Sequence, residues 1–206
     1  MAQLAPAKPV NQRRRIAVLR VAFLFMLPLL VFSRSAWDRF HWMFEVLEVI
    51  GVMMVIVAVL GRFWAVLYIG GRKNETIMQD GPYSICRHPL YLFSTIGVVG
   101  FAMMLGSIVV AAILGMLTFL ILQKTASREE TYLRAIFGPA YDVYAARVPR
   151  IVPKVSLFST PNEITFSVRS LRANFFDAMV FLSFIPLAEL LNELKENGFI
   201  PAFPLY

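Results

Sequence analysis

A polar cluster suited to holding a ligand precedes the apolar segment that begins at Pro89. The stretch 81–93 reads GPYSICRHPLYLF and holds one of the chain's two histidines. Proline favours the first position of a helix, so His88 falls near the N-cap and Tyr91 within the first turn. The free N–H groups and positive dipole of a helix start suit an anionic ligand group such as a carboxylate. A preceding Gly-Pro turn brings Tyr83 toward the same point.

Tyrosines at a membrane boundary also serve as plain interfacial anchors, and this alternative stays open for Tyr83 and Tyr91. Three such groups beside a proline-started helix favour a binding site.

Adjacent carboxylates at Glu129 and Glu130 supply the complementary chemistry. The two apolar segments before them form a helical hairpin, which returns Glu129 to the side of His88 and Tyr91. An acceptor for an ammonium group would then face donors for a carboxylate, a combination that suits an amino-acid-like ligand. The alternative is a solvated helix end with i, i+4 pairing, and it is stronger for Glu130, which can pair with Arg134.

Long apolar segments must position these residues. A membrane helix needs about 20 apolar residues, with about 17–25 as the usual range. Only Gly106 separates the third segment from the fourth, which predicts a tight antiparallel hairpin. The predicted fold class is therefore all-α, a polytopic helical membrane bundle. Five segments qualify as spans or come close: 16–32, 42–69, 89–105, 107–123 and 175–191.

The fourth span is predicted to extend well beyond the membrane. Residues 107–137 read as one helix of about 46 Å, at about 1.5 Å per residue, against an apolar layer of about 30 Å. Its last turns therefore project into water or the headgroup layer. Gly138 and Pro139 end it, and 139–149 predicts a short surface helix.

Composition supports an integral membrane protein and narrows the function classes. Hydrophobic residues make up 58% of the chain and the mean hydropathy is +0.66, above the roughly 45–50% apolar share of soluble domains. Cys86 is the single cysteine, which excludes an intramolecular disulfide. The chain shows no metal-ligand spacing, glycine-rich phosphate loop or aromatic-interleaved basic motif. We therefore expect neither a metal nor a nucleic-acid partner.

The distribution of positive charge predicts the topology. With a cytoplasmic N-terminus, fifteen of the twenty lysines and arginines lie inside and three outside, while Arg20 and Arg62 lie within spans. Five spans then place the C-terminus outside and the polar site on the cytoplasmic face. Arg62 is expected to pair with Glu45, Glu48 or a ligand, although Glu48 lies about 21 Å away along the same helix.

Two motifs carry a family resemblance. GPYSICRHPLY at 81–91, followed after the hairpin by EETYLRAIFGPAYDVYAARVP at 129–149, resembles the isoprenylcysteine carboxyl methyltransferases and related phospholipid methyltransferases. The resemblance covers about 70–153. It implies S-adenosylmethionine as methyl donor, bound at the cytoplasmic end of the hairpin. It places cofactor contacts at Glu75, Thr76, Ile77, Met78, Tyr83, His88, Pro89, Leu90, Tyr91 and Glu129. Glu75 stands where family members usually have a histidine.

The resemblance leaves the methyl acceptor open. Family members bind the substrate carboxylate with an arginine at the position of Thr125, and here Lys124 and Arg128 flank it. A carboxylate acceptor needs no general base; an amine or thiol does, and Glu130 is the candidate. The first expectation is an isoprenylated cysteine or similar prenyl carboxylate, and a phospholipid amine is the close alternative. A sterol-reductase-like enzyme and a non-catalytic membrane scaffold are the rivals from other classes.

We expect one integral-membrane domain over 1–206. It comprises the first two spans at 16–69, a core with the cofactor motifs at 70–153 and a C-terminal segment with the fifth span at 154–206. The expected partners are a lipophilic acceptor and membrane lipids, and the expected location is a bacterial inner membrane rather than an endoplasmic reticulum.

Overall fold

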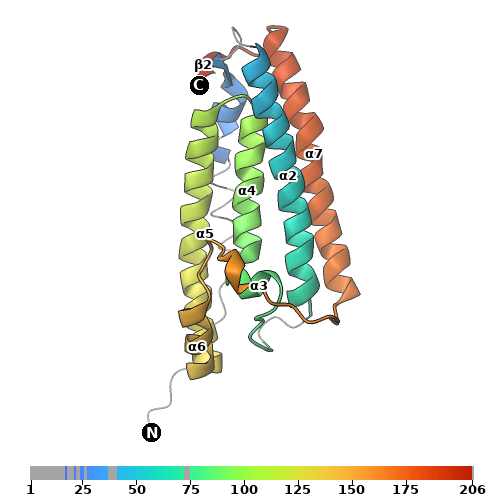
Figure 1. Ribbon diagram of the computed structural model, residues 1–206. Coiled ribbons are helices and arrows are strands. Elements are labelled where there is room, and N and C mark those ends of the chain that lie inside the picture. The colour runs from blue at the N-terminus through green and yellow to red at the C-terminus, as the bar shows by residue number, and fades with distance from the viewer. Residues whose placement is uncertain are drawn as a thin grey trace.

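The computed structural model is a bundle of long helices that lie side by side (Figure 1). It describes residues 27–36, 41–71 and 75–205, with isolated positions at 17, 21, 24 and 25. The long helices are α2 (His41–Ile69), α4 (Pro89–Met104), α5 (Ile108–Phe137) and α7 (Val168–Glu196). The short helices α3 (Pro82–Ile85) and α6 (Pro139–Arg147) lie at one end of the bundle.

Three of the long helices, α2, α5 and α7, are long and apolar enough to cross a membrane. Helix α4 is also apolar but has 16 residues, or about 24 Å, and is shorter than the usual span. The predicted all-α membrane bundle is confirmed. Seven of the seventeen residues of the first predicted span, 16–32, lie outside the described residues, and only its last part, 27–32, is described as a continuous helix. The count of five spans stays a prediction.

The predicted hairpin joins α4 and α5 by a turn of three residues, 105–107. Gly106 has a φ of 71°, a conformation that favours glycine, and the Ser107 hydroxyl caps α5 by accepting a hydrogen bond from the Val110 N–H at 3.2 Å. Helix α5 then runs 30 residues to Phe137, and Gly138, with a φ of 55°, ends it. The predicted continuation of this helix to residue 137 and the short helix α6 after it are therefore confirmed, while its projection beyond the membrane stays a prediction.

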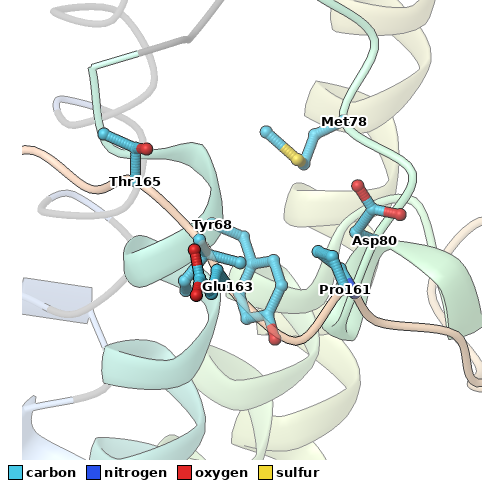
Figure 2. A pocket seen from close by; sticks show the side chains of 7 residues that line it. Tyr68, Met78, Asp80, Pro161, Glu163 and Thr165 are labelled. Carbon is cyan, nitrogen blue, oxygen red and sulfur yellow. The ribbon is translucent and has the colours of Figure 1, made fainter.

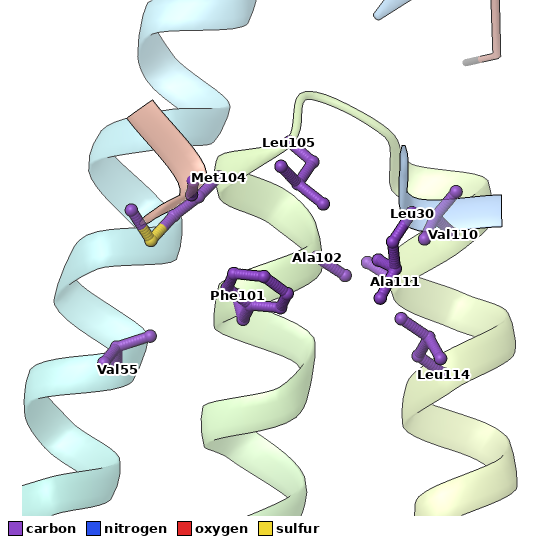
Figure 3. Close-up of a cluster of buried hydrophobic side chains, with 10 residues drawn as sticks. Leu30, Val55, Phe101, Ala102, Met104, Leu105, Val110, Ala111 and Leu114 are labelled. Carbon is purple, nitrogen blue, oxygen red and sulfur yellow. The ribbon is translucent and has the colours of Figure 1, made fainter. Parts of the chain in front are cut away.

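Small residues bring α2 and α4 close together. A Cβ atom on Gly51 would lie 2.6 Å from the carbonyl oxygen of Gly100, and one on Gly100 would lie 2.7 Å from the carbonyl oxygen of Gly51. The main core lies toward the hairpin turn, where side chains of α2, α4 and α5 point toward one another (Figure 3). Met104 and Val55 are among its fully buried side chains. These contacts fix α4 against both neighbours.

A small parallel strand pair closes the end of the bundle opposite α3 and α6. Strand β1 (Ser33–Ser35) pairs with β2 (Phe203–Leu205), which the all-helical prediction did not include. Lys195 donates to the carbonyl oxygen of Leu30 at 2.9 Å, and Ser35 donates to that of Gly106 at 2.9 Å. Because β1 and β2 form only through pairing between distant segments, local sequence patterns could not reveal them.

Arg62 is expected to pair with a glutamate of its own helix or with a ligand, and the distance along the helix already opposes Glu48; its ion-pair partner lies on another helix. Arg62 forms its ion pair with Asp177 of α7, at 3.6 Å between Nη2 and Oδ2, and donates to Ser94 of α4. A partner on the same helix would have to reach past several turns, whereas α7 packs directly against α2 at this level.

Candidate functional site

The start of α4 is held by the segment that follows α6. The N–H groups of Arg87 and His88 donate to the carbonyl oxygens of Pro149 and Arg150, at 2.9 and 3.0 Å. His88 is the N-cap and Pro89 the first helical residue, as the sequence predicts. The two sequence motifs, separated by the whole hairpin, are thus hydrogen-bonded to each other through their backbones.

The His88 ring lies between the two carboxylates of α5. Its Nε2 atom is 3.3 Å from Oε1 of Glu130, and its Nδ1 atom is 3.7 Å from Oε2 of Glu129. The ring is also stacked on Tyr91, with centroids 5.3 Å apart and planes within 3°. Tyr91 in turn packs with Leu122 of α5. The hairpin therefore brings His88, Tyr91 and Glu129 together, as the sequence analysis expected.

Glu130 is the buried centre of this end of the molecule. Arg150 donates to both of its oxygens, from Nε to Oε1 at 2.9 Å and from Nη2 to Oε2 at 2.8 Å. Nη2 of Arg87 lies 3.1 Å from Oε1, and the i, i+4 partner Arg134 lies 3.8 Å from Oε2. Because the Glu130 side chain is fully buried, its interpretation as a solvated helix-end residue is wrong.

These neighbours keep Glu130 ionised. Burial raises its pKa, but the hydrogen bonds from His88 and Arg150 and the charge of Arg87 outweigh burial and lower the pKa from 4.5 to about 2. An ionised carboxylate only accepts hydrogen bonds, so Nε2 of His88 must carry its proton. A carboxylate held in this way is also a weak proton acceptor near neutral pH.

The same charge cluster connects four segments of the chain. Arg150 also donates to Ser127 of α5 at 3.0 Å, and Arg87 donates to the carbonyl oxygen of Ala145 of α6 at 2.8 Å. Sequence reasoning missed Arg87 and Arg150 as site residues. Arg87 lies inside the first motif and Arg150 directly follows the second, and these positions were the available signal.

A tyrosine cluster lies beside the histidine. Tyr83 is 5% exposed, and its hydroxyl has no hydrogen-bond partner among the described residues, while its carbonyl oxygen accepts a hydrogen bond from Tyr144 at 2.8 Å. Burial raises the pKa of Tyr83 well above its usual value, and the nearby Tyr144, Cys86 and Glu129 raise it further. A neutral, unpartnered donor thus lies close to Glu129. A buried donor of this kind is costly unless a ligand satisfies it.

The other predicted cofactor residues are divided between two places. Ile77 packs against the cluster of Tyr141 and Tyr144, whereas Glu75 and Thr76 are exposed. Pro89 is buried and Leu90 half-buried at the start of α4. The structure therefore does not bring the whole 75–78 stretch to His88.

Met78 lines a separate polar cavity of about 110 Å³ between the end of α2, the 75–80 loop and the 158–167 segment. In Figure 2, Met78 and Asp80 extend from this loop on the side facing Tyr68. The remaining lining residues are Pro161, Glu163, Ile164 and Thr165. His88, Tyr91 and Glu129 do not line this cavity.

Lys124 and Arg128 project from the exposed side of α5, whereas Thr125 and Ala126 are buried. The role of these two cations in binding an acceptor stays a prediction. The part of the chain that the structure describes holds no group of three or more His, Cys, Asp or Glu residues arranged to bind a metal ion.

Comparison with known proteins now identifies the family. The family model described as phospholipid methyltransferase matches residues 45–140. The chain is 36% identical over 190 residues to the cobalt-zinc-cadmium resistance protein CzcN of Cupriavidus metallidurans, covering 92% of this chain and 87% of that protein. It is 34% identical over 201 residues to the nickel-cobalt-cadmium resistance protein NccN of Alcaligenes xylosoxydans xylosoxydans, covering 98% and 93%.

A more distant match links the chain to the enzymes that the motifs resemble. It is 30% identical over 83 residues to the protein-S-isoprenylcysteine O-methyltransferase of Schizosaccharomyces pombe, covering 40% of this chain and 35% of that enzyme. No solved structure matches the chain. The chain is an integral membrane protein that belongs to one family with CzcN and NccN; it carries a domain of the phospholipid methyltransferase model over residues 45–140 and has an isoprenylcysteine O-methyltransferase as a distant relative.

Proposed function

We propose that this protein is a membrane-embedded, S-adenosylmethionine-dependent methyltransferase that acts on a lipophilic acceptor. One observation carries the proposal: His88, stacked on Tyr91 at the start of α4, lies between Glu129 and Glu130. Family membership supports methyl transfer. The carboxylates and N–H donors around His88 suit the ammonium and carboxylate groups of the methyl donor.

The described side chains fit such a cofactor by charge and by hydrogen-bonding capacity. Glu129 would accept from the cofactor ammonium, and the start of α4 would receive its carboxylate. The buried Tyr83 hydroxyl, which has no partner among the described residues, is a donor still to be satisfied. When bound, the cofactor supplies an electrophilic methyl group on a sulfonium. The remaining predicted contacts are Glu75, Thr76, Ile77, Met78, Pro89 and Leu90.

We assign Glu130 a positioning role in place of the general-base role considered from the sequence. Its lowered pKa and its contacts with Arg87 and Arg150 oppose uptake of a proton, and they fix the tautomer and orientation of His88. Positioning of reactants and exclusion of water can supply much of the rate of a displacement reaction. Such a site suits an acceptor that needs no deprotonation.

A carboxylate on a prenyl chain is therefore the first acceptor class in this proposal. It is nucleophilic without a base, and its apolar chain explains why the enzyme is embedded in a membrane. The match to the phospholipid methyltransferase model supports a phospholipid amine as the second candidate. We further propose that the site faces the cytoplasm of a bacterium, with the N-terminus on the same side, because positive charge concentrates there.

Transfer of a radiolabelled methyl group tests the proposal and separates the acceptors. The purified protein would be given labelled S-adenosylmethionine with either a farnesylcysteine analogue or phosphatidylethanolamine in detergent. We expect base-labile label on the farnesyl compound, as for a methyl ester. Base-stable label on the phospholipid would favour the amine. No transfer to either acceptor, or to extracted membrane lipids, would contradict the proposed activity.

A further inference from the structure

A second polar cluster lies within the apolar part of the bundle, where α2, α4 and α7 meet. Arg62 of α2 donates from Nη1 to the Ser94 hydroxyl of α4 at 2.8 Å. Its Nη2 atom lies 3.6 Å from Oδ2 of Asp177 of α7, an ion pair without a close hydrogen bond. The guanidinium also lies 5.3 Å from the ring centroid of Phe181. Three helices thus hold one arginine in place.

Asn174 adds a donor that remains to be satisfied. It is 5% exposed, and its Nδ2 atom has no hydrogen-bond partner among the described residues. On α7 it precedes Asp177 by about one turn and Phe181 by two, and these spacings place the three residues on one face of the helix. A buried amide without a partner costs free energy unless a ligand or water satisfies it.

The cluster opens toward the apolar surface of the bundle. The Asp177 side chain is 66% exposed, whereas that of Arg62 is 17% exposed. Phe176 and Val180, beside Asp177 on α7, are exposed apolar residues of the kind that face lipid. Arg62 lies seven residues before the end of α2, or about 10 Å from that end. Charged groups at such depth are costly and generally mark a functional site.

The cluster is also connected to the candidate cofactor site. Ser94, which holds Arg62, donates to the carbonyl oxygen of Leu90 at 2.8 Å, in the first turn of α4. Leu90 is followed by Tyr91, on which the His88 ring stacks. Arg62 is therefore held about one helical turn deeper in the bundle than the residues assigned to the methyl donor.

We propose that Arg62 and Asn174 bind the anionic group of the membrane-embedded acceptor, and that Asp177 is the counter-ion of Arg62 in the absence of that acceptor. The inference rests on the proposed function. It specifies where the polar end of the methyl acceptor would bind. The ligand chemistry is a carboxylate or phosphate on an apolar chain, because Arg62 and Asn174 both present N–H donors. The contact with Asp177, at 3.6 Å, is longer than a hydrogen bond, so a lipid anion at hydrogen-bond distance would replace it.

Direct binding of matched lipid pairs tests this site without methyl transfer. The full-length protein in detergent would be titrated with N-acetyl-S-farnesylcysteine and with its neutral methyl ester, and separately with phosphatidylethanolamine and diacylglycerol. We expect the wild-type protein to prefer the acid over the ester about tenfold, as expected for a charge-assisted hydrogen bond. Arg62→Gln should remove this preference and Asn174→Leu should reduce it. Asp177→Asn should increase it, because a competing carboxylate is gone.

Arg169→Gln is the matched control, since Arg169 is exposed at the start of α7 and the same charge is removed there. Size-exclusion profiles show which variants fold, and Arg62→Lys, expected to keep part of the preference, replaces Arg62→Gln should the latter aggregate. A preference for phosphatidylethanolamine over diacylglycerol that Arg62→Gln abolishes supports the site and identifies phosphate as the anion. No anion preference in the wild type, or one that stays undiminished in Arg62→Gln or in Arg62→Lys, overturns the inference and leaves a structural ion pair.

Titration of the same samples with S-adenosylmethionine separates this inference from the proposed function. Cofactor binding without an Arg62-dependent anion preference contradicts the acceptor site alone. An Arg62-dependent preference without cofactor binding supports the anion site and contradicts the proposed methyl transfer.

Discussion

Arg150 holds Glu130 through two parallel hydrogen bonds, Nε to Oε1 at 2.9 Å and Nη2 to Oε2 at 2.8 Å. The pair joins the segment after α6 to the buried face of α5, and through Glu130 it reaches His88. The bidentate geometry is the strong form of an arginine–carboxylate contact. The orientation of the candidate cofactor site therefore depends on a residue that is not among the predicted cofactor contacts.

Removal of Arg150 should destabilise the fold. Arg150→Ala deprives a buried carboxylate of its bidentate partner, a change that typically costs about 3–5 kcal/mol, reduced here by the remaining Arg87 contact. The measurement is thermal unfolding in detergent, with Arg147→Ala as the control, whose hydrogen bond to Gln79 is exposed. Equal unfolding temperatures for the two variants would show that the Glu130 cluster is not a structural centre.

Glu130 should make stability depend on pH in the acid range. Its pKa is about 2 in the folded protein and near 4.5 when unperturbed, so the folded state binds its proton less readily. The contribution, on the order of 3 kcal/mol, is complete above about pH 4.5 and is lost as the pH falls through about 2. Denaturation of the wild type and of Glu130→Gln from pH 7 to pH 2 measures it. The difference between them should shrink only below about pH 4.5; a constant difference would refute the assignment.

Tyr83→Phe should separate stability from binding. The hydroxyl has no partner among the described residues, so its removal should leave stability unchanged or raise it by about 1 kcal/mol. The affinity for S-adenosylmethionine should fall several-fold, because the cofactor would lose a donor. Thermal unfolding and calorimetry on the same samples give both values. A destabilised variant with unchanged cofactor affinity would assign Tyr83 to the core alone.

Gly51→Ala should destabilise the bundle by about 1–3 kcal/mol, because its Cβ would lie 2.6 Å from the Gly100 carbonyl oxygen. Val57→Ala, at an exposed position of α2, is the control. Unfolding in detergent compares the two. A smaller loss for Gly51→Ala than for the control would mean that α2 and α4 do not approach so closely.

Local signals made part of this architecture predictable. Proline at position 89 set the start of α4, because its fixed φ suits the first helical position. Gly106 and Gly138 marked the two ends of α5, because glycine readily takes the positive φ of a turn. The hairpin then brought Glu129 to His88 by length alone. The i, i+4 pair of Glu130 with Arg134 was predictable. The contacts of Arg150 with Glu130 and of Asp177 with Arg62 were not, because they form through packing of distant segments. The hydrophobic periodicity of a single helix does not predict which residues of other segments contact it.

Calorimetric titration of the detergent-purified protein with S-adenosylmethionine tests the central claim most directly. We predict saturable binding in the wild type, and an affinity about 10- to 100-fold lower in Glu129→Gln and His88→Ala, since each loses a polar partner of the cofactor. Glu193→Gln makes the same chemical change as Glu129→Gln, at an exposed position near the C-terminal end of α7. This variant should bind S-adenosylmethionine like the wild type. Absence of binding in the wild type, or equal affinity in all four proteins, would contradict the account.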